Sequence, residues 1–227
     1  LDPRILRIFC LGIASGLPWV AIGSVLTLWL QDAGLTRSSI GYAGIIFTVY
    51  SINFLWSPLI DRASIPWLGK LGQRKSWLLL SQSAIALACL LTAATDPTLN
   101  AKITVLFCLL IAITSASQDI VIDAFRIESV LDNGNHDDNL LAAGAAMATA
   151  GWWTGFAGFG AIALWLKDTA ALDWSTIYLG FAALFTLIAA GLLSFPEPRR
   201  APNHEQAENG NASRMLMTIV SLSRLEK

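Results

Sequence analysis

Long stretches without any charged side chain are the feature that most constrains how this chain folds. A helix needs about 20 mainly apolar residues to cross a bilayer, and five uncharged runs reach that length. They cover residues 8–31, 38–60, 76–95, 139–166 and 174–196. In lipid every backbone N–H and C=O group must be paired internally, and these runs are far too long for the strands of a barrel. The sequence therefore predicts an all-α membrane protein.

A sixth apolar run, residues 103–118, is shorter and ends at Asp119. It becomes long enough to cross the membrane only if its helix continues through the acidic residues that follow. The composition agrees, since 55% of the residues are hydrophobic and 14% are charged, against about 25% charged in an average soluble domain. We therefore expect six transmembrane helices. Their approximate ranges are 5–30, 39–60, 76–95, 101–124, 139–166 and 174–195.

Lys and Arg residues fall unevenly on the two sides of this predicted bundle. One side holds Arg4, Arg7, Arg62, Lys70, Arg74, Lys75, Arg126, Arg199 and Arg200. The other side holds only Arg37, Lys102 and Lys167. Because cytoplasmic loops carry the excess of positive charge, both ends of the chain are expected in the cytoplasm. Residues 1–198 would form the bundle, and residues 199–227 a polar cytoplasmic linker with a short tail.

Several classes of function find no support in the sequence. A net charge of −1 offers no basic surface for nucleic acid. Cys10, Cys89 and Cys108 lie in apolar runs, so they are interpreted as small hydrophobes and not as a disulfide framework. The polar loop 132–139 lacks the ligand spacing of a calcium loop and is interpreted as a solvated turn. We expect no enzyme, no cofactor and no metal.

Residues 115–126 place an amide, two carboxylates and a guanidinium on one predicted helix. Ionisable groups at membrane depth are costly and usually face a bundle interior or a watery cavity. Asp119 lies roughly 27 Å along the helix from Ala101, so Gln118 and Asp119 are deep enough to line a substrate or proton pathway. Asp119 would carry a proton, and Gln118 would hydrogen-bond a polar substrate.

Two other predicted helices offer candidate pathway residues. Gly16 and Pro18 interrupt the first run, and a discontinuous helix frees backbone groups to meet a solute. Gly and Pro are also simply common in membrane helices. Trp152 lies at the middle of the fifth run, where it would stack on a sugar face, face the lipid or pack in the core. The nearby Gly151-x-x-x-Gly155 pattern indicates close helix packing.

The loop after the second predicted helix carries an acid followed by clustered bases. Asp61, Arg62, Arg74 and Lys75 would hold neighbouring helix ends together as a cytoplasmic gating latch. Asp123 and Arg126, spaced i and i+3, either join this latch or simply mark the membrane interface as a pair. The bases alone would also satisfy the positive-inside rule.

This loop resembles the signature between helices 2 and 3 of the major facilitator superfamily. It departs from that signature at Ser57, where the superfamily has a Gly, and by a longer insert. Three stretches, residues 11–18, 54–62 and 115–123, closely resemble AmpG-type muropeptide permeases of this superfamily, and residues 163–166 and 196–198 also match. The resemblance runs from about Arg4 to Pro198.

The resemblance implies the N-terminal half of a twelve-helix fold, with a C-terminal six-helix half missing from this chain. It implies a multi-pass permease of the bacterial inner membrane that imports anhydromuropeptides from periplasm to cytoplasm, driven by protons. An acetyl-coenzyme A type transporter of the same superfamily is an alternative with a similar fourth helix. A second alternative is a truncated membrane fragment that transports nothing.

Overall fold

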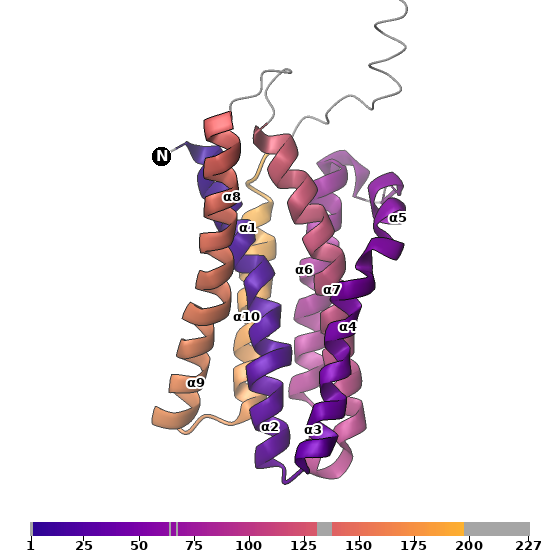
Figure 1. Cartoon of the computed structure of the whole chain (residues 1–227), viewed down its shortest axis with the longest axis vertical. Helices are drawn as coiled ribbons and strands as arrows, with labels where there is room; N and C mark the ends of the chain where they lie inside the picture. The colour runs from indigo at the N-terminus through magenta and orange to yellow at the C-terminus, as the bar shows by residue number, and fades with distance from the viewer. Residues whose placement is uncertain (1, 64, 67, 131–137, 198–227) are drawn as a thin grey trace, which may run out of the picture.

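The computed structural model describes residues 2–63, 65–66, 68–130 and 138–197, and within these ranges every regular element is helical. The predicted tail at 199–227 and most of the polar loop 132–139 lie outside the described residues. The α-helices stand side by side along one axis of the bundle (Figure 1). Their bounds are α1 Pro3–Val20, α2 Leu26–Asp32, α3 Arg37–Ala43, α4 Thr48–Ile52, α5 Ser57–Arg62, α6 Gln73–Ala93, α7 Pro97–Val130, α8 Asp138–Trp153, α9 Phe159–Thr169 and α10 Trp174–Leu192.

Five stretches of the described chain are long and apolar enough to cross a membrane. They are Pro3–Asp32, Arg37–Leu55, Gln73–Ala93, Pro97–Val130 and Trp174–Leu192. This confirms an all-helical membrane protein. A sixth helical stretch, α8 to α9, is rich in Ala and Gly, and it is not among the five. A sixth span and cytoplasmic chain ends stay predictions.

Short irregular turns divide three of these stretches. A π-helical turn at Ala21–Val25 joins α1 to α2, and another at Thr154–Gly158 joins α8 to α9. Between α3 and α4 the chain passes through a 3-10 turn, Gly44–Phe47. In α7 the backbone of Asn100 is not helical, so the continuous part of that helix begins after it. π-helical turns are rare and occur often at functional sites.

The core lies where α1, α6, α7 and α10 meet. α6 packs along both α7 and α10, and α1 packs along α8. Tyr178, Phe185 and Leu17 are fully buried there. By contrast, only 17% of the stretch Arg37–Leu55 is buried. One face of the bundle is therefore covered by few other helices.

Glycines bring the backbones of α1 and α8 into direct contact. A methyl group added at Gly16 would overlap the carbonyl oxygen of Trp152, and one added at Gly155 would overlap that of Ile13. Gly12 and Gly151 lie against each other in the same way. Close approach of this kind is what small residues permit in membrane helices. The α1–α8 pair therefore packs backbone to backbone.

Candidate transport cavity

Pro18 interrupts the hydrogen bonding of α1, and Gln118 compensates for it. A proline has no N–H group, so the carbonyl of the residue four positions earlier, Ala14, loses its helical donor. The side-chain amide of Gln118 donates to this carbonyl over 3.1 Å. Near the following π-helical turn, the Tyr178 hydroxyl donates to the carbonyl of Ala21 over 2.7 Å. Side chains from α7 and α10 thus satisfy the discontinuous first helix.

Gln118 uses both ends of its amide inside the protein. It is fully buried, and its oxygen accepts a hydrogen bond of 2.8 Å from the side chain of Gln82 on α6. The predicted contact with a polar substrate stays a prediction, and the amide would have to leave these partners to make it. Gly16 and Pro18 are also buried, Gly16 against the backbone of Trp152 in α8. Their predicted pathway role likewise stays a prediction.

The other polar side chains of this α7 segment contact different helices. The Ser15 hydroxyl donates to the Asp119 carboxylate over 2.6 Å. The indole N–H of Trp56, just before α5, donates to the hydroxyl of Ser117 over 3.0 Å. The Tyr50 hydroxyl of α4 and the Ser115 hydroxyl are both buried, and neither has a hydrogen-bond partner among the described residues. Residues 115–119 are therefore a polar crossing point of the bundle.

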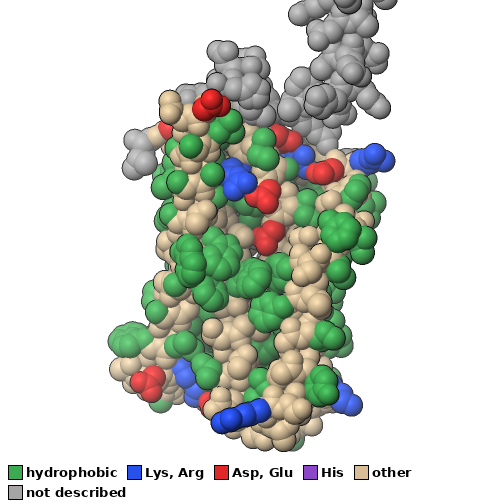
Figure 2. All heavy atoms as spheres, viewed as in Figure 1, with side chains coloured by type: hydrophobic (Ala, Val, Ile, Leu, Met, Phe, Trp, Pro, Cys, Tyr) green, Lys and Arg blue, Asp and Glu red, His purple; other side chains and the backbone are tan. Residues whose placement is uncertain are grey.

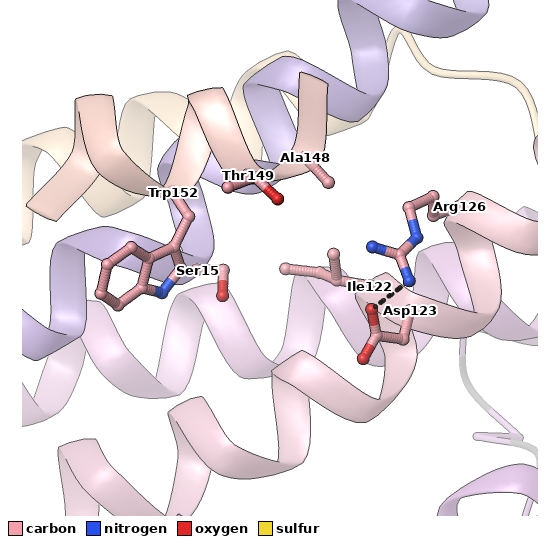
Figure 3. Close-up of a pocket in the computed structure, with 8 residues that line it drawn as sticks. Ser15, Ile122, Asp123, Arg126, Ala148, Thr149 and Trp152 are labelled. Atoms are coloured by element: carbon pink, nitrogen blue, oxygen red, sulfur yellow. Dashed lines mark ion pairs between the residues drawn. The ribbon is translucent and has the colours of Figure 1, made fainter. Parts of the chain in front are cut away.

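A cavity of about 260 Å³ opens beside this crossing point, between α1, α7 and α8. Ser15 enters it from α1, Asp123 and Arg126 from α7, and Thr149 and Trp152 from α8 (Figure 3). Gly12, Ile122 and Ala148 complete its lining. Acidic and basic side chains also show on the face of the molecule seen in Figure 2, above a group of hydrophobic ones. We call this space, with its lining residues, the transport cavity, after the role that we propose for it.

Asp123 and Arg126 belong to the wall of this cavity. Their side chains form an ion pair of 3.1 Å along α7, as their i and i+3 spacing predicts. Among the described residues neither one pairs with Arg74 or Asp61, with which the gating latch would join them. The structure instead brings the pair together with Ser15 and Trp152, a grouping that sequence reasoning did not propose.

An aromatic cluster continues from the cavity along the bundle. Trp152 stacks on Phe156 with ring centres 5.1 Å apart and meets the edge of Trp19 at 5.9 Å. Trp19 in turn lies 4.5 Å from Tyr50 and 5.3 Å from Phe47. Trp152 is only partly buried. The cavity thus offers a charged pair at one side and an aromatic surface at the other.

Two of the remaining latch residues, Asp61 and Arg74, form a separate ionic cluster with Glu128 at the start of α6. The Arg74 guanidinium bonds Asp61 at 2.7 Å and Glu128 at 2.8 Å, and its side chain is only 9% exposed. Arg62 is exposed and forms no ion pair within the part of the chain that the structure describes. The cluster therefore joins the ends of α5 and α7 to α6.

Glu197 caps α6 in the same cluster. Its two carboxylate oxygens accept the backbone N–H groups of Arg74 and Lys75 at 2.8 and 2.9 Å. The Lys75 ammonium donates hydrogen bonds to the carbonyls of Leu193 and Phe195, just beyond the end of α10. Sequence reasoning missed this role for Glu197. The only signal was an acid in a proline-flanked stretch that follows a predicted helix.

These features define a helical membrane protein with a small open cavity between its helices, lined by apolar residues and a few polar and charged ones. The chain is 31% identical over 86% of its length to a putative transporter, AmpG 4, of Rickettsia conorii. It is 34% identical over 87% to the anhydromuropeptide permease of Escherichia coli K12. A putative transporter AmpG 3 of Rickettsia prowazekii is 40% identical over 55% of the chain. These matches confirm the resemblance to AmpG-type permeases.

The chain spans 46%, 38% and 30% of these three relatives, respectively, which is less than half of each. No protein-family model matches the chain. The relatives' names are those of transporters and a permease, which agrees with the expectation that this chain is not an enzyme.

Proposed function

We propose that this chain forms half of a secondary transporter that moves anhydromuropeptides from the periplasm into the cytoplasm. The observation that carries the proposal is the transport cavity, in which Trp152 lies close to Ser15 and to the Asp123–Arg126 pair. An anhydromuropeptide combines sugar rings with a charged peptide. An aromatic face suits a ring, and fixed polar groups suit hydroxyls and carboxylates.

The size of the cavity supports a partner half. At about 260 Å³ it lies below the range of roughly 300–1,000 Å³ that small-molecule pockets usually occupy. A disaccharide with a peptide needs more contact surface than this one wall supplies. Only 17% of the stretch Arg37–Leu55 is buried, so this face of the bundle is exposed. It leaves room for a second bundle to complete the site. The proposal therefore includes a C-terminal six-helix half.

The setting we propose is the bacterial inner membrane, with six spans and both chain ends in the cytoplasm. The sixth span would be α8 to α9, which is continuous through its π-helical turn. Arg74 and Lys75 lie at the bundle end to which the positive-inside rule assigns the cytoplasm. In this setting the Arg74 cluster would act as the cytoplasmic gating latch.

Proton coupling through Asp119 is a further part of the proposal. The carboxylate accepts a hydrogen bond from Ser15, which itself lines the transport cavity. Acidic side chains within spans are rare and mark substrate and proton pathways. A change in the charge of Asp119 would therefore alter its hydrogen bond to Ser15 at the cavity wall.

Uptake of radiolabelled anhydromuropeptide tests the proposed function. The host would be a strain that lacks its own permease, and it would express either this chain or the complete reading frame that encodes it. We expect uptake with the complete reading frame, inhibited when the proton gradient is collapsed. Uptake equal to the empty-vector strain in both cases would overturn the proposal, and uptake insensitive to the gradient would remove its proton-coupled part.

A further inference from the structure

Two arginines of the described bundle, Arg74 and Arg126, are held very differently. Arg74 is enclosed by two carboxylates and is 9% exposed. Arg126 has one ion-pair partner, Asp123, which comes from its own helix and is 64% exposed. Exposed pairs of this kind contribute only about 0–1 kcal/mol. Arg74 is therefore fixed, whereas the partner of Arg126 is easily exchanged.

Arg126 also points to a place where a ligand would meet it. Its guanidinium lines the transport cavity, 30% exposed, on the side opposite Thr149 and Trp152 (Figure 3). A guanidinium offers a planar fork of N–H donors that matches a carboxylate with two parallel hydrogen bonds. The Asp123 carboxylate engages one of these donors at 3.1 Å.

We propose that Arg126 is the binding residue for a carboxylate of the ligand, and that the Asp123 carboxylate occupies this position on the guanidinium until the ligand binds. This inference rests on the proposed function and names the part of the substrate that the cavity recognises. The peptide carboxylate would lie at Arg126, and the sugar end would lie toward Trp152. Binding then exchanges an internal carboxylate for an external one, so the guanidinium keeps one carboxylate partner throughout.

Competition between the two carboxylates gives the inference a distinctive signature. Asp123→Asn removes the competing charge, so affinity for an acidic ligand should rise about two- to fivefold. This factor corresponds to the free energy of an exposed ion pair. Arg126→Gln removes charge-assisted hydrogen bonds, so affinity should fall about 10- to 100-fold. If the pair served only to hold α7 in shape, both variants would weaken binding together.

The test is equilibrium binding of tritiated anhydromuropeptide to the full-length protein in nanodiscs. A second ligand, the same molecule with its peptide carboxyl groups amidated, competes for the site and reports binding without the charge. We expect Asp123→Asn and Arg126→Gln to change the affinity for the acidic ligand in opposite directions. Both variants should leave the affinity for the amidated ligand unchanged. Arg126→Lys should retain an intermediate affinity, because it keeps the charge and loses the fork.

Arg37→Gln is the matched control, since Arg37 is an exposed arginine at the opposite end of the bundle. Circular dichroism and thermal unfolding would establish that each variant is folded. If Arg126→Gln failed to fold, the Asp123→Asn and Arg126→Lys affinities would still decide the matter. If Asp123→Asn and Arg126→Gln changed the affinity for the acidic ligand in the same direction, this inference would be overturned while the proposed function stood. The same holds if either variant changed the affinities for both ligands equally. Wild-type protein that bound neither ligand would overturn both.

Discussion

Gln118 of α7 takes the place of the hydrogen-bond donor that Pro18 removes from α1. Its amide reaches the carbonyl of Ala14 over 3.1 Å, four residues before the proline. A buried carbonyl without a partner is costly, so the proline in the first helix and the glutamine in the fourth span depend on each other. The same side chain accepts from Gln82 and thereby links three helices.

This dependence predicts a coupled pair of mutations. Gln118→Ala should lower stability by about 1–3 kcal/mol, because the Ala14 carbonyl and the Gln82 amide both lose a partner. In a Pro18→Ala background the restored N–H can bond Ala14, so the same change should cost less. Thermal unfolding of the four proteins in detergent measures this coupling. Strictly additive losses would show that the two residues act independently.

The glycine contact between α1 and α8 predicts a position-specific effect of one methyl group. Gly16→Ala should destabilise the protein by about 1–3 kcal/mol, because the methyl group overlaps the backbone of Trp152. Gly180→Ala on α10 is the matched control, since nothing lies within 4 Å of the added group. That variant should be neutral or more stable by up to about 1 kcal/mol. Equal melting temperatures for the two variants would contradict the packing described above.

The ionic cluster at α6 predicts that the arginines on the two sides of the α5–α6 loop, Arg62 and Arg74, differ sharply in their contribution to stability. Arg74→Ala leaves Glu128 buried without its partner and should cost about 3–5 kcal/mol. Arg62→Ala removes an exposed side chain with no ion pair in the described chain, so a change within about 0.5 kcal/mol is expected. Chemical denaturation of the purified proteins compares them. A small loss for Arg74→Ala would mean that the cluster contributes little to the fold.

The proposed proton role of Asp119 predicts a loss of coupling with little loss of fold. Asn is similar in size and still accepts the hydrogen bond from Ser15, but it carries no titratable proton. Asp119→Asn should therefore abolish uptake driven by a pH gradient while leaving the melting temperature within a few degrees. Asp168→Asn, at an exposed acid near the end of α9, is the control. Wild-type uptake by Asp119→Asn would remove this carboxylate from the coupling mechanism.

The fold was largely predictable because the hydrophobic runs report burial directly. Uncharged stretches marked the helices, and Pro18 marked the interruption of the first one. Helical spacing also predicted the contact between Asp123 and Arg126. These features depend on residues that lie close together in the chain, where periodicity is informative.

The partners across helices were not predictable in the same way. Nothing in the sequence near Pro18 indicates a glutamine 100 residues later, and nothing near Arg74 indicates Glu197 as the cap of α6. An estimate of depth along one helix places Asp123 and Arg126 near the membrane edge, and it carries no information about their neighbours on α8. Only the packing of α8 against α1 brings Trp152 to the same cavity.

The backbone contact between α1 and α8 has a consequence for how the transport cavity changes width. Two of its three walls, the one with Ser15 and the one with Trp152, are joined without intervening side chains. Because no side chains lie between the two backbones, the helices cannot move closer together or slide freely. They must therefore tilt together as one rigid unit. Any widening or narrowing around a solute therefore falls on α7, the helix that carries Asp119, Asp123 and Arg126.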